Sequence, residues 1–451
     1  SLNGHTLFGW QVNRGVDALP DFFRADQFRK KLERPDVLEK LFQAGHLDGA
    51  FQLAALEPPK RADKVLSGQI DATPRVDILE PKAGETLPQN SATVRVRIRL
   101  PAGGKLTRAK VFANGVVAAD RRLVSERIEG QGREVTYQWQ AGLPSEERSL
   151  IQVSVGTDAD VTGFSQLIVE HADARTKQNR RPRLYLLALG IDRYQDPAIQ
   201  PLAYSVADAR AVLELLKTRA AGLYDLAATK LLVNEQVTRG AWKETFARLR
   251  TELADDVRPD DLLVIFLAGH GFVDPAAQRY YYAGYDLTRD GFMSGHYGGS
   301  ISWSDFELLA DIPCRKLAFL DTCHSGAIQP LRGRNLKVAV RAFQEDVVLT
   351  VTAAAGDERS EENVDWKHGA FTKSLLEVLS GEAGASSSGI ITLGDVVSYV
   401  QRSVPILTEG RQNPAAAPED LLPFVSLGLT ALPRQARNPA SAPALFRLAL
   451  P

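Results

Sequence analysis

Residues 263–271 read LVIFLAGHG and residues 317–326 read LAFLDTCHSG, and these two stretches decide the fold. Each begins with a continuous apolar run, which is typical of a parallel strand buried on both faces of a sheet. Each then turns to reactive side chains, His270 in the first and Asp321 and Cys323 in the second. Ligand sites of open parallel sheets lie beyond the carboxyl ends of the strands. We therefore expect these residues to meet at one edge of a sheet.

The chain around the two stretches alternates between apolar strands and helical patterns. Strands are predicted at residues 183–189, 229–233, 261–268, 316–320 and 347–352, and helices at 207–216, 241–253, 372–379 and 393–400. This order predicts an α/β domain over residues 183–430, with a largely parallel sheet sandwiched by helices. Residues 431–451, rich in Ala and Pro, are predicted to form an extended C-terminal tail.

The chain before residue 173 divides into two parts. Residues 1–72 are predicted to be a helical N-terminal segment, from apolar spacing at 21–28, 31–42 and 47–55. Residues 73–172 change to period two, most clearly in VRVRIRL at 94–100, and carry a hairpin signal at Asn114-Gly115. Several short strands within about 100 residues predict an immunoglobulin-like β-sandwich. Its basic stripe, Arg97 and Arg99, is interpreted as a solvated face. A polar linker, 173–182, follows.

Composition excludes several classes of protein. The 451 residues carry a formal net charge of −1, which points to no nucleic-acid partner and no anionic membrane. No apolar stretch approaches the roughly 20 residues of a membrane span, and no signal sequence opens the chain. Two cysteines, Cys314 and Cys323, make no disulfide framework and suit a reducing compartment, so a cytoplasmic location is predicted. No cluster of residues has zinc-ligand spacing, and no metal site is predicted.

His270 and Cys323 together favour nucleophilic catalysis. A neighbouring imidazole can take the proton of a thiol and later protonate the leaving amine. Glycine beside the histidine leaves backbone N–H groups open to the oxyanion. A single such His is more often structural, and a single such Cys more often buried, so the argument rests on the pair. His324 adjoins the cysteine and is expected to point away from it. The other histidines are assigned to polar loops (His296, His368) or to packing and surface roles outside the α/β domain (His5, His46, His171).

The motifs AGHG at 268–271 and DTCHSG at 321–326 resemble the signature of metacaspases and bacterial caspase-like peptidases. The resemblance spans residues 183–429 and includes LGIDRY at 189–194, VADA at 206–209, HGAFT at 368–372 and QNP at 412–414. It implies a caspase-like fold and a cysteine endopeptidase of a stress, cell-death or defence pathway in a bacterial cytoplasm. It also implies a Cys323–His270 dyad and an oxyanion hole formed by the amides of Gly271 and Cys323. The front segments resemble those that link a β-propeller to the peptidase in some bacterial members, so we expect them to regulate or target through a protein partner and to add nothing to the chemistry.

The acidic residues Asp321 and Asp208 predict specificity for a basic side chain before the cleaved bond. Caspases that cut after Asp carry Gln two residues before the nucleophile, and that position is Asp321 here. By the resemblance, Asp208 adds a second carboxylate to this S1 pocket. Two carboxylates favour Arg or Lys. The alternatives are a helix N-cap for Asp208 and a structural carboxylate for Asp321, and Arg359 would partly neutralise the pocket if it lined it.

Other segments of the sequence bear on regulation and on alternative functions. Residues 326–346 carry four basic residues next to the Cys323 strand, which predicts self-cleavage there. Acidic pairs (Asp255-Asp256, Asp260-Asp261, Glu361-Glu362) lack EF-hand spacing. The acidic pairs are therefore assigned to the solvated surface. No cofactor is predicted to be required, and activation by Ca²⁺ is an open alternative. The sequence lacks the Gly-x-Ser-x-Gly motif of a serine hydrolase and the Gly-rich phosphate loop of a nucleotide-binding protein, so neither function is predicted. A catalytically silent caspase-like adaptor is the remaining alternative.

Overall fold

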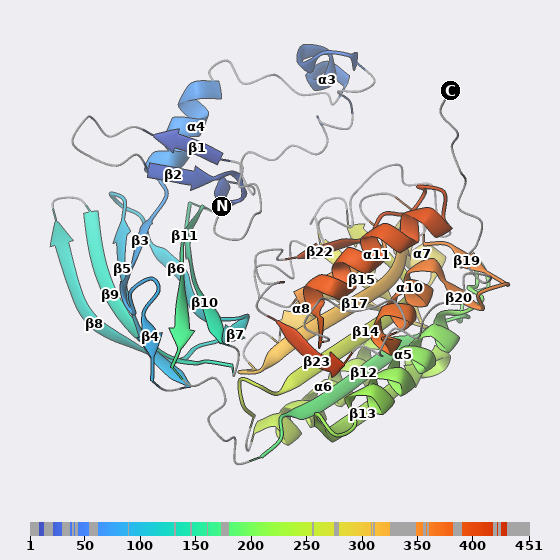
Figure 1. Cartoon of the computed structure of the whole chain (residues 1–451). Helices are drawn as coiled ribbons and strands as arrows, with labels where there is room; N and C mark the ends of the chain where they lie inside the picture. The colour runs from blue at the N-terminus through green and yellow to red at the C-terminus, as the bar shows by residue number, and fades with distance from the viewer. Residues whose placement is uncertain are drawn as a thin grey trace, which may run out of the picture.

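The computed structural model describes most of the chain (Figure 1). The described residues are 9–12, 21–28, 37, 40, 44–53, 62–88, 90–129, 132–144, 147–159, 161–172, 180–254, 257–274, 279–307, 309, 312–324, 349–354, 358, 360–381, 390–417, 422 and 425–430. The predicted tail, residues 431–451, and the predicted self-cleavage segment, 326–346, lie outside these residues. No helix of the described part is long and apolar enough to cross a membrane.

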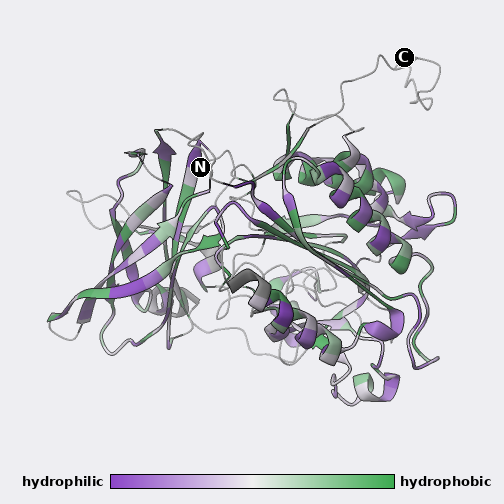
Figure 2. Ribbon diagram, turned by 90° about the horizontal axis from the view of Figure 1, so that it is seen from below, coloured by the Kyte–Doolittle hydropathy of each residue, from purple (hydrophilic) through white to green (hydrophobic). Residues whose placement is uncertain are grey.

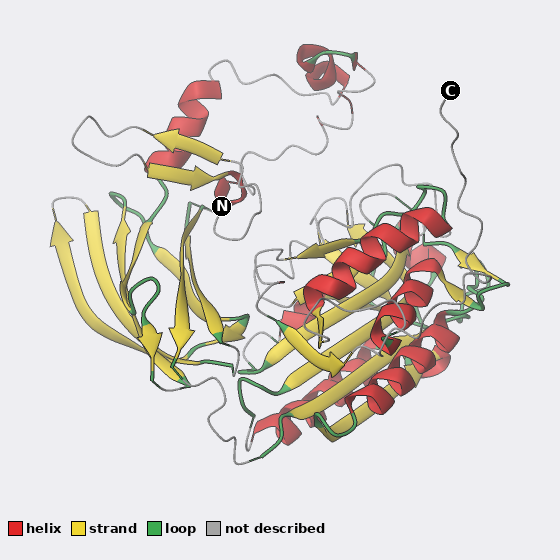
Figure 3. Ribbon diagram, in the orientation of Figure 1, coloured by secondary structure: helices red, strands yellow, loops and turns green. Residues whose placement is uncertain are grey.

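The α/β domain is built on one sheet with the strand order β13-β12-β14-β17-β18-β22. Its strands are β12 (Arg183–Gly190), β13 (Asp225–Val233), β14 (Leu262–Asp274), β17 (Arg315–His324), β18 (Leu349–Thr352) and β22 (Ala415–Ala417). The pairs from β13 to β18 are parallel, and β22 is antiparallel to β18. Every predicted strand of this domain overlaps one of these, and Figure 3 shows helices on both sides of the sheet.

Helices cover both faces because the buried strands are continuously apolar, so that the alternate side chains present an apolar surface on each side of the sheet. Helices α5 (Ser205–Ala220), α10 (Ala370–Ser380) and α11 (Leu393–Leu407) pack on the face that carries Val264 and Phe266 of β14. Helices α6 (Arg239–Ala254) and α8 (Trp303–Glu307) pack on the face that carries Leu263 and Ile265. The side chains of one strand therefore belong to two separate cores, which confirms the predicted layers.

Strand β14 continues beyond the end of its neighbour β12. The pairing with β12 ends at Gly190 and Ala268, and from Gly271 to Asp274 the strand pairs instead with the antiparallel β15 (Arg279–Ala283). On its other side β14 pairs with β17 as far as Gly271 and His324. The expectation that His270 and Cys323 follow their strands is therefore wrong in detail. Both lie within strands, in a part of the sheet that extends past β12 because β15 takes its place.

Residues 75–171 form a sandwich of two sheets. One sheet has the order β3-β5-β9-β8 and the other β4-β11-β10-β6-β7. The strands are β3 (Arg75–Glu80), β4 (Thr86–Leu87), β5 (Ser91–Leu100), β6 (Leu106–Ala113), β7 (Val116–Val117), β8 (Ala119–Glu129), β9 (Gly132–Gly142), β10 (Arg148–Thr157) and β11 (Thr162–His171). Inward residues of β5, such as Val94 and Val96, are buried between the sheets, and hydropathy alternates along the strands (Figure 2). The hairpin prediction is confirmed, because Asn114 and Gly115 have φ of 46° and 82° between β6 and β7.

The basic stripe of β5 is engaged in ion pairs within the sandwich. The Arg99 guanidinium contacts the carboxylates of Asp77 at 2.9 Å and Glu134 at 3.2 Å. Arg95 pairs with Glu80 at 3.1 Å. The stripe is thus a half-exposed face of ladder ion pairs, in agreement with the solvated interpretation.

The sandwich and the α/β domain share a core. Phe112, Leu150 and Ile168 of the sandwich are buried in the same apolar cluster as Leu184 and Leu262, which open strands β12 and β14. Where the linker enters the α/β domain, the Arg180 guanidinium donates to both oxygens of the fully buried Asp261 carboxylate, at 2.8 and 2.9 Å. The front of the chain is therefore packed onto the α/β domain as well as tethered to it.

The N-terminal segment differs from its prediction. Residues 21–28, expected to be helical, form strand β2 (Asp21–Arg24) and a 3-10 turn (Ala25–Phe28), and β2 pairs with β1 (Gly9–Val12). The adjacent aromatic residues at 22 and 23 fit either period, and the pairing with β1 decides for the strand. Helix α3 (Leu47–Leu53) agrees with the prediction at 47–55, whereas helix α4 (Ala62–Asp71) forms in the polar run after Pro58-Pro59, where the sequence predicts a linker. Most of 31–42 lies outside the described residues.

Candidate active site

The ladder between β14 and β17 places His270 directly beside Cys323. The two residues are Cα partners in neighbouring parallel strands, and such strands lie about 4.8 Å apart. The same register pairs Ala268 with Asp321 and Gly269 with Thr322. Residues 268–271 are thus adjacent to residues 321–324, although His270 and Cys323 lie 53 positions apart along the chain. The side chain of Cys323 lies outside the described part of the structure.

His270 is held in one tautomer by a backbone carbonyl. Its ring is buried, and its Nε2 lies 2.8 Å from the carbonyl oxygen of Gln200. A carbonyl oxygen only accepts hydrogen bonds, so Nε2 carries the proton and Nδ1 of the neutral ring is the free base. This Nδ1 has no hydrogen-bond partner among the described residues. Burial lowers the pKa of His270, and the bond to Gln200 opposes that change in part. The ring is therefore neutral and ready to accept a proton.

Aromatic side chains fix the backbone and the ring of His270. The Tyr194 ring stacks on the imidazole, with centroids 5.1 Å apart and planes 17° apart, and its hydroxyl accepts a hydrogen bond from the His270 amide at 2.9 Å. Gly269 has φ of 153°, and a Cβ there would lie 2.9 Å from the hydroxyl oxygen of Tyr282. Position 269 thus accepts no larger residue without a shift, and the histidine is presented by a rigid backbone.

The other cysteine is unsuited to chemistry. Cys314 is fully buried ahead of β17, and burial raises the pKa of its thiol to about 11. Such a thiol stays protonated at neutral pH, and the thiolate is the nucleophile. Among the two cysteines, the position beside His270 is therefore the one that offers a base.

Gly271, whose amide is predicted for the oxyanion hole, lies one residue beyond the histidine. It is the partner of Tyr282 on β15 and of His324 on β17. Gly271 and Cys323 belong to successive steps of one ladder, since Cys323 pairs with His270 and Gly271 with His324, and the role of their amides stays a prediction.

Asp208 and Asp321 come together around Gly369. Asp208 lies in the first turn of α5 and Asp321 in β17, and both carboxylates are buried. A Cβ at Gly369 would lie 3.0 Å from Asp321 Oδ2 and 3.4 Å from Asp208 Oδ2. Only a residue without a side chain leaves this space between the carboxylates open. The structure thus brings both acidic residues of the predicted S1 pocket to one place, and β17 also carries Cys323.

Burial and mutual repulsion disfavour two negative charges in this space. Burial raises the pKa of Asp321 to about 7, with further contributions from Asp208 and Glu362. Burial likewise raises the pKa of Asp208 to about 6, against hydrogen bonds from His368 and Gly369 that lower it. An entering cation would remove this repulsion, because opposite charge favours the ionised carboxylates.

Several groups that hold this pair have no assigned role in the sequence prediction. The His368 Nδ1 lies 2.6 Å from Asp208 Oδ1, and the Gly369 amide donates to Asp208 Oδ2 at 3.1 Å. The Thr372 hydroxyl donates to Asp321 Oδ2 at 2.6 Å. The assignment of His368 to a polar loop is therefore wrong, since it forms β20 (His368–Gly369) and reaches a buried carboxylate. The signal in the sequence was the motif HGAFT, which supplies all three groups.

The motif QNP at 412–414 braces the segment that leads to the acidic pair. The buried Gln412 side chain accepts from the Glu361 amide at 2.8 Å and donates to the Ala353 carbonyl at 2.9 Å. The Asn413 amide and side chain both donate to the Glu358 carboxylate, at 2.6 and 2.8 Å. These bonds hold the chain that follows β18. Arg359, within that segment, lies outside the described residues.

The acidic pairs are engaged within the fold. Asp261 is buried against Arg180, so its assignment to solvated surface is wrong. Glu362 accepts from the Ala203 and Tyr204 amides, at 2.9 and 3.2 Å, just before α5. Residues 255–256 lie outside the described structure, and within it no cluster of His, Cys, Asp or Glu has the arrangement of a metal site.

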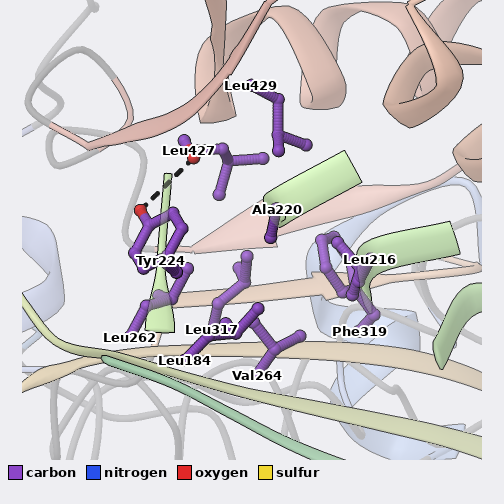
Figure 4. A pocket seen from close by; sticks show the side chains of 10 residues that line it. All are labelled: Leu184, Leu216, Ala220, Tyr224, Leu262, Val264, Leu317, Phe319, Leu427 and Leu429. Carbon is purple, nitrogen blue, oxygen red and sulfur yellow. Dashed lines mark hydrogen bonds between the residues drawn. The ribbon is translucent and has the colours of Figure 1, made fainter. Parts of the chain in front are cut away.

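An apolar pocket lies away from these residues (Figure 4). Sheet residues Leu184, Leu262 and Leu317 form its floor, α5 forms one wall, and Leu427 and Leu429 of β23 (Ser426–Thr430) close it. The Tyr224 hydroxyl donates to the Leu427 carbonyl at 3.3 Å. Its floor residues stand near the beginnings of the strands, whereas His270 and Cys323 stand near the ends. The pocket is thus no part of the candidate active site.

Comparison with known proteins identifies the α/β domain. The family model of the caspase domain, Peptidase C14, matches residues 183–422, more than half of the chain. Among solved structures, pro-Sf-caspase-1 is similar over 53% of this chain and 88% of its own, with 13% identity and a TM-score of 0.34. A DUF4466 family protein from Parabacteroides merdae is matched over 21% of this chain and only 42% of its own, with 12% identity and a TM-score of 0.16. No curated protein matches the chain.

Proposed function

The chain belongs to the caspase-domain family of peptidases, and from this premise we propose that it is a cysteine endopeptidase that cleaves proteins after Arg or Lys. Cys323 is the nucleophile and His270 the general base. The observation that carries the proposal is the ladder pairing of Cys323 with a histidine whose Nδ1 is the free base. A thiol and an imidazole in neighbouring strand positions are what acyl transfer by cysteine requires.

The proposed reaction uses the free nitrogen of His270 twice. Nδ1 takes the proton of the Cys323 thiol, and the thiolate attacks the carbonyl carbon of the scissile bond. The Gly271 and Cys323 amides stabilise the oxyanion. The imidazolium then gives its Nδ1 proton to the leaving amine, and water hydrolyses the acyl-enzyme. Throughout, the Gln200 carbonyl keeps accepting from Nε2, which stabilises the charged ring and prevents it from turning.

The preference for Arg or Lys rests on the acidic pair. Asp208 and Asp321 are buried, lie within reach of each other across Gly369, and come from elements next to the dyad. A guanidinium or ammonium entering this space forms charge-assisted hydrogen bonds, each worth about 1.5–3 kcal/mol. A substrate Asp would add a third negative charge, so cleavage after Asp is disfavoured.

The wider proposals concern regulation and the front of the chain. The enzyme acts in the cytoplasm, in a stress, cell-death or defence pathway, and is controlled by self-cleavage within 326–346. It needs no cofactor, and activation by Ca²⁺ is tested by measuring cleavage with and without calcium. The sandwich is of immunoglobulin type and binds a regulatory protein partner. Its two strand orders, β3-β5-β9-β8 and β4-β11-β10-β6-β7, support that type.

The test compares purified wild type, Cys323→Ala and Cys314→Ala on fluorogenic peptides that differ only in Arg, Lys or Asp before the cleaved bond. We expect wild type and Cys314→Ala to cleave after Arg and Lys, with and without calcium, and Cys323→Ala to be inactive. Turnover by Cys323→Ala would disprove the assignment. A wild type that neither cleaves nor reacts with a thiol-directed peptide electrophile would indicate the silent adaptor instead.

A further inference from the structure

His368 reaches from the surface to the buried acidic pair. It stands in the short hairpin of β19 (Glu362–Asn363) and β20, immediately before α10, and is 160 residues from Asp208 along the chain. Its side chain is 24% exposed, whereas that of Asp208 is 3% exposed. The imidazole is therefore in part exposed to solvent while its Nδ1 contacts a carboxylate at the base of the proposed pocket.

The contact between His368 and Asp208 contains one shared proton. At 2.6 Å, the Nδ1 of His368 and the Oδ1 of Asp208 cannot both be without hydrogen. The other carboxylate oxygen, Oδ2, accepts from the Gly369 amide. Each oxygen of the Asp208 carboxylate thus takes part in one hydrogen bond. Both bonds are needed to fix the rotation of the carboxylate, so His368 contributes to its orientation.

The charged and titratable groups around Asp208 come from every element packed against it. Asp321 approaches from β17 and Glu362 from β19, and both are acidic. The Asp321 carboxylate is in turn bonded by Thr372 of α10 and by the Ser360 hydroxyl. Among these groups, His368 is the one that can carry a positive charge. It is therefore the residue that can balance the pair when the pocket is empty.

We propose that His368 is a positioning residue of the S1 pocket, which orients Asp208 and balances its charge until the basic side chain of a substrate takes over that charge. The inference rests on the proposed function and names a residue that determines specificity without touching the reacting atoms. A guanidinium that enters the pocket then meets the Asp208 carboxylate in the position that His368 fixes. The Asp208 and Asp321 carboxylates then share the substrate's charge.

The predicted effect is on substrate binding and on its pH dependence. His368→Ala is expected to raise KM for Arg peptides about tenfold, the value of one charge-assisted hydrogen bond, and to change kcat less than twofold. The hydrogen bond from His368 lowers the pKa of Asp208. Without it, Asp208 takes up a proton at higher pH, so KM begins to rise at a higher pH as the solution is acidified. His368→Asn keeps a donor near the Nδ1 position but cannot carry a charge, so it should recover only part of the loss in KM.

The experiment measures kcat and KM of wild type, His368→Ala, His368→Asn and the control His296→Ala from pH 5 to 9, using full-length protein. His296 contacts Ser294 on an exposed loop, and its replacement should change nothing. The rate of alkylation of Cys323 by iodoacetamide reports whether the dyad is intact in each variant. An unchanged KM and pH profile in His368→Ala would overturn the inference, and if that variant fails to fold, His368→Asn with a wild-type pH profile of KM decides against a charge role. A wild type that does not cleave after Arg or Lys would instead refute the proposed function.

Discussion

The substitution Asp321→Asn distinguishes two possible roles of the Asp321 carboxylate, one in the substrate pocket and one in the stability of the fold. The substitution keeps the size of the side chain and removes one of two negative charges in a buried space. Burial and the neighbouring Asp208 raise the pKa of Asp321 to about 7 from an ordinary value of 3.8. The folded protein therefore holds a proton that the unfolded chain releases between these values. Its stability falls as the pH rises through this window, because a charge is then forced into the fold.

The magnitude follows from this shift. One pKa unit corresponds to about 1.4 kcal/mol, so at pH 8 the charge of Asp321 costs on the order of a few kcal/mol. Asn cannot ionise, and the Thr372 hydroxyl can still donate to its side-chain oxygen. Asp321→Asn is therefore expected to raise Tm at pH 8 and to leave it nearly unchanged at pH 4. The same change should lower kcat/KM for Arg peptides about 10- to 100-fold, the equivalent of about 1.5–3 kcal/mol of lost charge-assisted bonding.

The assay pairs thermal unfolding at pH 4 and pH 8 with peptide cleavage at pH 8. Asp305→Asn is the matched control. Burial raises the pKa of Asp305, but the hydrogen bonds from Arg239 and Ser302 lower it by more, so the pKa lies below its ordinary value. Its neutralisation should therefore lower Tm at pH 8 and leave the preference for Arg intact. A lower Tm at pH 8 in Asp321→Asn, or unchanged cleavage after Arg, would show that Asp321 is a structural carboxylate.

Three further changes test the site and the domain contact. Gly369→Ala suits the local backbone, with φ of −67°, but puts a methyl group 3.0 Å from Asp321 Oδ2. It should abolish most cleavage after Arg while alkylation of Cys323 persists, and full cleavage would contradict the pocket. Tyr194→Phe leaves the buried His270 amide without its acceptor, a cost of about 1–3 kcal/mol. Thermal unfolding should show it as a lower Tm, with kcat within tenfold of wild type, whereas an unchanged Tm would speak against that bond. A chain that begins at residue 176 loses Phe112 and its sandwich neighbours from the shared core and should unfold at lower temperature than the full chain. Equal Tm values would mean that the contact contributes no stability.

The sheet and the nearness of the His270 and Cys323 positions are the parts that the sequence predicts well. The runs at 263–268 and 317–320 are continuously apolar, which is typical of buried parallel strands, and the polar residues after such strands lie at one edge of the sheet. The length of strand β14 is the exception. Nothing in the sequence indicates that β14 continues to Asp274, because this part of the strand forms by pairing with β15 after the pairing with β12 has ended.

What supports the reactive residues could not be predicted in the same way. The partner of His270 is a main-chain carbonyl at Gln200, and a carbonyl leaves no trace in residue type. Tyr194 falls within the motif LGIDRY, yet its stacking on the imidazole depends on how the segment after β12 meets strand β14. His368 reads as a loop residue, since polar neighbours surround it, and its role emerges only when α5 is packed against β20. Local pattern thus predicts strands, and tertiary packing determines which polar side chains meet.

The ladder that joins His270 to Cys323 also limits how the proposed enzyme could be kept silent. Strands β14 and β17 are paired continuously from Leu262 and Arg315 to Gly271 and His324, at the centre of the sheet. Central strands are among the last parts of a domain to open. Separating base from nucleophile would therefore mean unzipping the domain itself. A latent form of the proposed enzyme would keep these two residues assembled and act on admission of the substrate instead. The place for this control is the proposed pocket, where α5, β17, β20 and α10 converge and where a small displacement of one segment changes which side chain fits.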